Sequence, residues 1–365
     1  MHFVIAIPTF NRLEYLKKNI FSIKKQKINS NIKLSVCISN SASSDETGSY
    51  LNVLTAKNEN IIIFNDKLES EYLNNGCLAS IIPQDADWVW YLGDDDFFVS
   101  ENAINDVIKV ILDNDIDFIH VSQSRRSAKT FQLLIEKSEN LSNRLGYLEF
   151  FGWISSVVIK KNLFINALKN TQSIYTKQWP DCSAFIHSYF FYNELYGKSC
   201  AFFDSGSVEP QDLKQTEQSI KRWKNENIPE RYLFVINDFI NMSKNNLLPS
   251  CTNNTFFRYQ NINIWDRWLI YLINETIRDD YSNEFKTSQE FLKKIDFHWL
   301  NLVNFVNIIS DPPQKKKISI MVKTIMGLCV KFLFDKDNQK IYKPFLIDQI
   351  NLLKESCYDF KTFYE

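Results

Sequence analysis

The chain has few glycines, few arginines and no paired-cysteine motif, and each shortage argues against a class of site. Only eight of its 365 residues are glycine, and neither GxGxxG nor GxxxxGK[ST] occurs, so neither a Rossmann dinucleotide site nor a P-loop is expected. Lysines outnumber arginines 33 to 9 and the net charge is −1, which does not favour nucleic acid as a partner. Seven scattered cysteines without CxxC indicate neither a zinc site nor a disulfide framework.

The bulk composition is that of a soluble enzyme. A chain of 365 residues predicts about two domains, and a hydrophobic content of 45% is enough for a sizeable core. The first residues, Met1 to Ile5, include no basic n-region or cleavage site, which argues against secretion. Together with the unpaired cysteines, this predicts a cytoplasmic protein.

The first third of the chain alternates short apolar runs with segments of helical periodicity. Strands are expected at residues 3–7, 32–38, 61–64, 88–92 and 118–121. The first should stop at Pro8, which lacks an N–H, and Asn11 with Glu14 predicts a capped helix after it. A further helix is expected from Ser100, before the last strand. This order predicts an α/β fold with a mostly parallel, doubly wound sheet.

Three consecutive aspartates, Asp94, Asp95 and Asp96, follow the apolar run 88–92 and a single glycine. They stand where that strand would leave the sheet, and such sheets bind ligands outside the carboxyl ends of their strands. Adjacent carboxylates repel one another, so a cation is expected to neutralise them. Oxygen ligands without a His or Cys cluster suit Mg²⁺ or Mn²⁺, shared with a substrate phosphate. The alternative is an acidic loop that simply faces water.

Three strand-end motifs together resemble family 2 glycosyltransferases. They come in that family's order and spacing over about residues 1–125, and the nearest likeness is to the abequosyltransferase-like branch. The motifs are Pro8-Thr9-Phe10-Asn11-Arg12, Ile38-Ser39-Asn40-Ser41-Ala42-Ser43-Ser44-Asp45 and Tyr91-Leu92-Gly93-Asp94-Asp95-Asp96.

The resemblance implies a GT-A fold and an inverting transfer from a nucleotide-activated sugar, with Mn²⁺ or Mg²⁺ bridging the diphosphate. In the family, the first two motifs grip the base and ribose, and the third reaches the ribose and the metal. Carried over, the donor-binding residues are Pro8, Thr9, Phe10, Asn11, Arg12, Asn40, Ser41, Asp45, Gly93, Asp94 and Asp95. The metal-binding residues are Asp94, Asp95 and Asp96, with Asp95 the first choice for metal contact.

Asn40 departs from the family pattern, which usually has an aspartate after the second strand to accept the N3–H of uracil or thymine. A neutral amide is a weaker acceptor, and it also offers donors, so a cytidine donor becomes plausible. The donor is therefore expected to be a UDP, dTDP or CDP sugar. The same departure keeps open a relative that binds nucleotide sugars without catalysis.

The acceptor side is expected after the third motif. Residues 126–145 are polar and predict a loop or lid over the site, and residues 150–159 predict a turn and a strand. Trp153, Ser155 and His187 are the acceptor-side candidates. Trp153 could stack on a sugar face, and the alternative is a core aromatic side chain.

An inverting transfer needs a base for the acceptor hydroxyl, and the resemblance places an acid near the start of a helix after the metal motif. Asp181, after Trp179 and Pro180, fits that description. Its alternative role is a carboxylate that only stabilises the helix start. His187, on the same expected helix, is the second candidate for the base.

The whole chain is expected to divide into two domains. Residues 1–212 form the transferase domain, with a donor half at 1–125 and an acceptor half at 126–212, and residues 213–365 form a helical C-terminal domain or extension. The basic and apolar segment 315–334 is short for a membrane span and contains Lys323 and Lys331. It predicts a buried helix, a dimer interface, or an interfacial helix in peripheral contact with the membrane.

These expectations combine into one function with two alternatives. The first is a metal-dependent, inverting glycosyltransferase that extends a bacterial surface polysaccharide (O-antigen, lipooligosaccharide or capsule) on a glycan or lipid-linked acceptor. The second is an inactive nucleotide-sugar-binding or scaffold relative, and the third is a sugar nucleotidyltransferase. The third is disfavoured because the usual glycine- and arginine-rich nucleotide loop is missing.

Overall fold

The computed structural model describes residues 1–58, 60–65, 71–124, 131–145, 150–177 and 186–211. Nine further positions are described singly: 242, 316, 320, 324, 341, 344, 345, 348 and 349. The chain divides into two compact units, Met1–Ser219 and Ile220–Glu365. Apart from the single positions, the expected helical domain at 213–365, with its segment 315–334, lies outside the described residues.

The described part of the first unit alternates strands and helices, as the apolar periodicity predicted. Its strands are β1 (His2–Thr9), β2 (Lys33–Asn40), β3 (Ile61–Asn65), β4 (Trp88–Tyr91), β5 (Asp96–Phe98), β6 (Phe118–Gln123), β7 (Gln132–Lys137), β8 (Val157–Lys160) and β9 (Ser199–Pro210). Its helices are α1 (Leu13–Lys24), α2 (Thr47–Ala56), α3 (Glu71–Ser80), α4 (Ala103–Asp113), α5 (Ser138–Leu145), the 3-10 turn η1 (Ile154–Ser156), α7 (Lys161–Lys177) and α8 (Ile186–Leu195).

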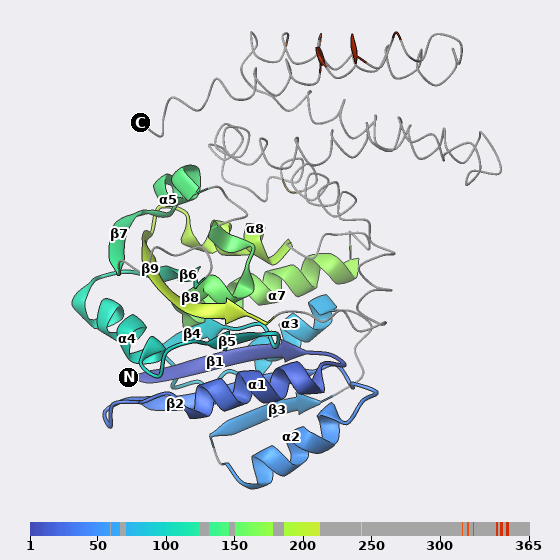
Figure 1. The fold of residues 1–365 in the computed structure, drawn as a ribbon, viewed down its shortest axis with the longest axis vertical. Coiled ribbons are helices and arrows are strands. Elements are labelled where there is room, and N and C mark those ends of the chain that lie inside the picture. The colour runs from blue at the N-terminus through green and yellow to red at the C-terminus, as the bar shows by residue number, and fades with distance from the viewer. Residues whose placement is uncertain are drawn as a thin grey trace, which may run out of the picture. The chain divides into compact units, whose positions relative to one another are not determined.

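The strands form one mixed sheet in the order β3-β2-β1-β4-β8-β6-β9-β5, with β7 paired to β9 (Figure 1). The four strands β3, β2, β1 and β4 are all parallel, and β6 is parallel to β9. The remaining pairs are antiparallel. The predicted α/β fold with a largely parallel central sheet is confirmed, and its parallel half carries the carboxyl-edge loops that the motifs occupy.

Helices cover both faces of this sheet, which makes it doubly wound. Along β1, Phe3, Ile5 and Ile7 point into the core cluster shared with α1, α2 and α4, and α1 lies in front of the strands in Figure 1. On the other face, the buried Tyr91 of β4 contacts Phe164 of α7. Both faces of the sheet are therefore covered by helices and carry buried apolar side chains, as expected for a mostly parallel sheet.

The first strand continues through Pro8, although we predicted that it would stop there. β1 is paired with β2 as far as Thr9 and Asn40. The missing N–H does no harm because alternate residues of β1 point their backbone groups toward β4. Ala6 accepts a bond from Leu92 on that side (2.9 Å), and β4 has already ended at the level of Pro8.

The predicted capping box of α1 is wrong. Arg12 occupies the N-cap position without a side-chain cap bond, and Asn11 has a left-handed backbone (φ 52°). The side-chain oxygen of Asn11 accepts the N–H of Ser44 instead (2.7 Å). The carboxylate of Asp45 takes over the cap by accepting the N–H of Leu13 (3.2 Å). A residue of the next loop therefore caps this helix, which a local sequence pattern does not reveal.

The loop or lid expected at 126–145 is wrong over its described part, because residues 132–145 form β7 and α5. β7 is antiparallel to β9 and is largely exposed, so its polar residues belong to an edge strand and not to a loop. The turn and strand predicted at 150–159 are confirmed as η1 and β8. No helix among the described residues combines the length and apolarity needed to cross a membrane.

Candidate active site

Three loops meet at the carboxyl edge of the parallel strands. Residues 10–12 follow β1, residues 41–46 (the β2 loop) follow β2, and residues 93–96 (the aspartate turn) follow β4. Thr9 stands beside Asn40 in the sheet register. The hydroxyl of Thr9 donates to Asp94 across the edge (2.7 Å). The strand-end motifs therefore lie together, as the parallel sheet predicts.

Arg12 neutralises two of the three aspartates. Its Nη1 lies 3.0 Å from Oδ1 of Asp94 and 2.7 Å from Oδ2 of Asp95. The Asp94 side chain is nearly buried, whereas those of Arg12 and Asp95 are each 26% exposed. The attraction of Asp94, followed by that of Asp95, raises the pKa of Arg12 above its usual value despite partial burial. A cation from the chain thus holds the carboxylates that the sequence assigned to a metal.

Asp96 turns inward and is held differently. Its carboxylate accepts the hydroxyl of Ser155, and the same oxygen of Ser155 accepts the backbone N–H of Gly93 (2.7 Å). Burial, followed by repulsion from Asp95, raises the pKa of Asp96 to about 8, against hydrogen bonds from Ser155 and Trp153 that lower it. Burial also raises the pKa of Asp94 to about 6, although Arg12 opposes this increase. The inner carboxyls thus retain a proton more readily than ordinary aspartates.

Gly93 provides the space in which these carboxylates fold back. A Cβ atom at this position would lie 2.8 Å from Oδ2 of Asp96, 3.0 Å from Oδ1 of Asp95 and 3.2 Å from the hydroxyl oxygen of Ser155. The first two distances are too short for a carbon atom against hydrogen-bonded oxygen atoms. The turn therefore requires glycine here for close packing, not for an unusual backbone angle.

The carboxylates do not form a three-ligand metal cage. Across the described residues, no group of three or more His, Cys, Asp or Glu side chains is arranged to hold a metal ion. Asp94 and Asp96 are bonded inward, and Asp95 alone keeps an exposed carboxylate. One or two carboxylates nevertheless suffice for Mg²⁺ when substrate phosphates and water complete its shell. The donor set at Asp95 fits a metal that arrives with a phosphate.

Asn40 uses its amide within the protein. Its oxygen accepts the N–H and the hydroxyl of Ser43 (3.3 and 2.5 Å), and its nitrogen donates to the side-chain oxygen of Asn65 at the end of β3 (2.8 Å). Asn40 is completely buried, whereas Asn65 is exposed. Asn40 therefore shapes the β2 loop, and it orients the amide of Asn65 at the adjoining strand end.

Two other donor-binding candidates join the loops to each other. Asn11 donates its backbone N–H to the hydroxyl of Ser43 (2.8 Å), while its side chain accepts from Ser44. Asp45 accepts the N–H groups of Leu13 and Thr47 (3.2 and 3.0 Å), which begin α1 and α2. Among the other candidates, Phe10 is 44% exposed, Pro8 is half-buried and Ser41 is buried.

Two of the acceptor-side candidates, Ser155 and His187, are buried, and Trp153 is half-buried. Ser155 is completely buried beneath the aspartate turn, and Trp153 packs against the main core cluster. His187 is 3% exposed, and its ring lies 6.2 Å from that of Tyr91 and 5.9 Å from that of Phe191. Asp181 lies outside the described residues, as does Trp179.

Two polar residues near the site were missed from the sequence. Asn74 of α3 donates to the backbone oxygen of Thr9 (3.2 Å) and accepts the hydroxyl of Ser39. Asn65 ends β3, as described above. Asn65 directly follows an apolar run, which was the available signal. Asn74 is buried on a helix that contains other polar residues, so no local pattern distinguishes it.

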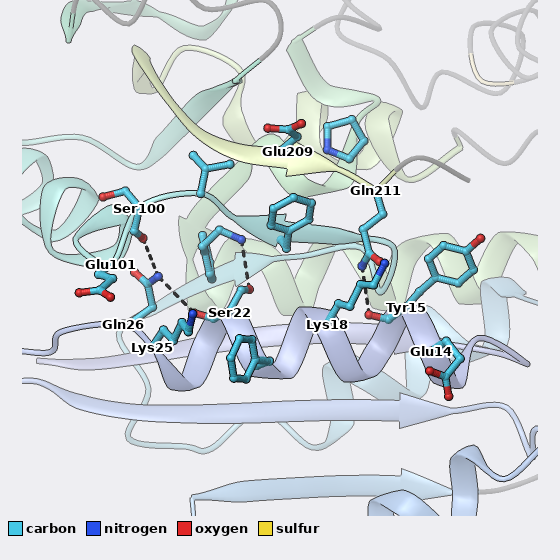
Figure 2. A pocket seen from close by; sticks show the side chains of 15 residues that line it. Glu14, Tyr15, Lys18, Ser22, Lys25, Gln26, Ser100, Glu101, Glu209 and Gln211 are labelled. Carbon is cyan, nitrogen blue, oxygen red and sulfur yellow. Dashed lines mark hydrogen bonds between the residues drawn. The ribbon is translucent and has the colours of Figure 1, made fainter. Parts of the chain in front are cut away.

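A groove of about 990 Å³ runs along the outer side of α1 (Figure 2). Its walls come from α1, from β5 and the residues after it, and from the end of β9. Tyr15, Phe21 and Val99 contribute apolar surface, with Lys18 and Glu209 among the charged residues. The groove is distinct from the carboxyl edge, and Gln211 lies at its boundary with the aspartate turn.

Comparison with known proteins finds a family profile that matches part of the chain and solved structures with a similar fold. The profile described as Glycosyl transferase family 2 matches residues 4–167. Abequosyltransferase RfbV of Salmonella typhimurium (strain LT2) is 25% identical over 175 residues, which are 43% of this chain and 52% of that protein. The match thus spans about half the length of this relative.

Solved structures of S. aureus TarS 1-349 resemble the chain along most of its length. The TM-score is 0.53 at 13% identity, with 98% of this chain and 91% of TarS 1-349 covered. For the same protein in complex with UDP-GlcNAc it is 0.52 at 14% identity, with the same shares covered. At such identities the likeness concerns the fold alone, which is GT-A.

Proposed function

We propose that the chain transfers a sugar from a nucleotide-sugar donor to a glycan or lipid-linked acceptor, because residues 4–167 match the profile described as Glycosyl transferase family 2. The supporting observation is the contact network at the carboxyl edge, where Thr9 and Arg12 reach the aspartate turn. The acceptor would be a growing bacterial surface polysaccharide, in keeping with the similarity to an abequosyltransferase.

A divalent metal is part of this proposal because the exposed carboxylate and the donor diphosphate repel each other. Asp95 would hold Mn²⁺ or Mg²⁺, with Asp94 behind it and the phosphates completing the shell. When bound, such a metal neutralises the diphosphate leaving group. Ion pairs from Arg12 hold the carboxylates of Asp94 and Asp95 in place, so the turn retains its shape before the donor arrives.

The proposed transfer inverts the anomeric centre. The acceptor oxygen attacks the anomeric carbon, the carbon–oxygen bond to the diphosphate breaks, and a base takes the acceptor proton. We assign the base to Asp181. His187 is a poor alternative because its ring is 3% exposed and packs edge-on against aromatic rings.

The donor base is the least constrained part of the proposal. With the oxygen of Asn40 already bonded to Ser43, the amide of Asn65 is the polar group presented at the adjoining strand end. Its nitrogen can donate to ring acceptors such as N3 of cytosine, or to the carbonyl groups of uracil and thymine. CDP, UDP and dTDP sugars are therefore the donors to compare.

One assay tests the activity directly. The protein is incubated with UDP, dTDP and CDP sugars and Mn²⁺ or Mg²⁺, with and without pyrophosphate, and the nucleotide products are separated. Slow release of a nucleoside diphosphate by hydrolysis supports a glycosyltransferase. Nucleoside triphosphate formed from pyrophosphate and the sugar nucleotide indicates a nucleotidyltransferase. Saturable binding without any product indicates the inactive relative.

The base assignment predicts a specific defect. Asp181→Asn should leave donor binding nearly unchanged and lower kcat by about 10²–10⁴-fold, the usual contribution of a positioned general base. Glu194→Gln, an acid on α8, is the matched control and should retain normal kcat. If Asp181→Asn loses only thermal stability and the folded fraction keeps its kcat, the residue merely stabilises its helix.

A further inference from the structure

A buried asparagine on α1 holds both ends of the aspartate turn. Asn19 is completely buried, and its Nδ2 donates to the backbone oxygens of Gly93 and Asp96, each at 2.8 Å. Both hydrogens of one amide are thus committed to one turn. The turn itself closes with a longer backbone bond from Asp96 to Gly93 (3.2 Å), and the side chain of Asn19 adds two shorter bonds that connect both of its ends to α1.

The middle of the turn is held from the end of β9. The backbone N–H of Gln211 donates to the backbone oxygen of Asp95 (2.8 Å). Its side-chain Nε2 donates to the backbone oxygen of Tyr15 on α1 (3.0 Å), and Figure 2 shows this second bond. Gln211 is 7% exposed. Two amide side chains therefore connect α1 to the turn, one directly and one through β9.

Both amides leave an oxygen atom unsatisfied. Oδ1 of Asn19 and Oε1 of Gln211 are buried and have no hydrogen-bond partner within the described part of the chain. An unpaired buried acceptor costs free energy, so an apolar side chain would be the better choice for packing alone. What the amides achieve in return is the placement of the carbonyls of Gly93, Asp95 and Asp96.

We propose that Asn19 is the positioning residue of the aspartate turn, with Gln211 as its second support. Its role in the reaction rests on the proposed function, because the turn is where the donor phosphates and metal would bind. The amide nitrogen of Asn19 donates to backbone oxygens of the turn and not to its carboxylates. Its loss should let the turn shift away from α1, and shifts of about 1 Å can cost about 10²-fold in rate.

The matched control is Asn105 on α4. Its Nδ2 also donates to a backbone oxygen, that of Lys27 (2.6 Å), and its Oδ1 is likewise buried without a partner in the described residues. It belongs to neither the turn nor the carboxyl-edge loops. Asn19→Ala and Asn105→Ala therefore remove the same kind of bond inside and outside the proposed site.

The first measurement is hydrogen exchange of the segment that contains residues 88–99, read by mass spectrometry. The amide hydrogens of Gly93 and Asp96 are both bonded within this structure. Asn19→Ala should speed their exchange at least about fivefold, whereas Asn105→Ala should leave that segment unchanged. Equal exchange in the two variants would overturn the proposal. This measurement needs no substrate, so it holds even if the proposed activity fails.

The second measurement separates positioning from stability. With the nucleotide sugar that wild type hydrolyses, Asn19→Ala should lower kcat by about 10–10²-fold, and Asn105→Ala by less than twofold. Rates that fall only with the folded fraction, equally in both variants, would make Asn19 merely structural. If Asn19→Ala does not fold, Gln211→Ala decides. The Gln211→Ala variant keeps the backbone bond to Asp95. It should raise the exchange rate of the 88–99 segment and lower kcat, each about threefold. Wild-type exchange and wild-type kcat in this variant would overturn the proposal.

Discussion

The β2 loop and the aspartate turn stand on strands either side of β1, yet they are held in place differently. In the β2 loop, Ser43 and Ser44 bond to the amides of Asn40 and Asn11, so neutral partners satisfy one another. In the aspartate turn, carboxylates are partly buried against one another, and a single guanidinium lies among them. Neighbouring strand ends thus carry a neutral network and a charged one.

This difference predicts that substitutions in the two regions affect different properties, stability in the β2 loop and activity in the aspartate turn. A loop whose hydrogen bonds are internal keeps its conformation without a ligand, so a change there acts first on stability. Under the proposed function, the aspartate turn, with more carboxylates than cations, takes up a metal ion, so a change there should act first on activity. The four predictions below test this division.

Asp95→Asn should have the largest effect. It keeps the size and one acceptor of the side chain but removes the exposed negative charge, so turnover of the nucleotide sugar should fall by about 10²–10³-fold. The side chain is 26% exposed, so the free energy of unfolding should change little. Steady-state kinetics and thermal unfolding measure the two quantities. Asp113→Asn, at the exposed end of α4, is the control, and near-normal activity of Asp95→Asn would remove Asp95 from the metal assignment.

Gly93→Ala and Gly48→Ala should change the free energy of unfolding in opposite directions. A Cβ at Gly93 would lie 2.8 Å from the Asp96 carboxylate, which overpacks the turn and should cost about 1–3 kcal/mol of unfolding free energy, with loss of activity. At Gly48, in the first turn of α2, the nearest atoms are 3.7 and 3.8 Å away, so alanine should stabilise by about 0.5–1 kcal/mol. Chemical denaturation measures both. A stabilised Gly93→Ala would mean that the turn has room to move.

The parallel half of the sheet could be predicted from the sequence because its signals are local. The apolar runs that became β1, β2, β3 and β4 show strand periodicity, and their order specifies parallel pairing. The antiparallel strands β5, β7 and β9 were not predicted. β5 has only three residues and β7 is a half-exposed edge, so neither carries a clear apolar pattern.

The sequence predicted where the site residues would lie but not which residues would bond to one another. That Thr9, Arg12 and the aspartates would meet follows from the rule for carboxyl edges. That Arg12 would neutralise Asp94 and Asp95, or that Ser155 would hold Asp96, depends on contacts 59 to 83 residues apart in sequence. No periodicity encodes such pairs. The expectation that the clustered charge demands a metal therefore overlooked a cation within the first motif.

Asn40→Asp would introduce charge into the neutral network. The bond from Nδ2 to Asn65 would become a contact between two oxygen atoms, at a position with no exposed surface. The expected cost is about 1–2 kcal/mol of unfolding free energy, because an acceptor is left unpaired in the interior. Asn65→Asp is the matched control, since it keeps the acceptor for Asn40 on an exposed residue. Equal losses in the two variants would show that burial of Asn40 is not what matters.

Asp45→Ala should have the smallest effect and should act on stability. The carboxylate accepts the N–H groups of Leu13 and Thr47, so its removal exposes the starts of α1 and α2 and should cost about 0.5–2 kcal/mol of unfolding free energy. Asp45→Asn retains an acceptor and should cost less. The Michaelis constant for the nucleotide sugar tests whether Asp45 also binds the donor. Because both oxygens already serve the helices, a constant within twofold of wild type would remove Asp45 from the donor-binding set, whereas a rise in both variants would keep it there.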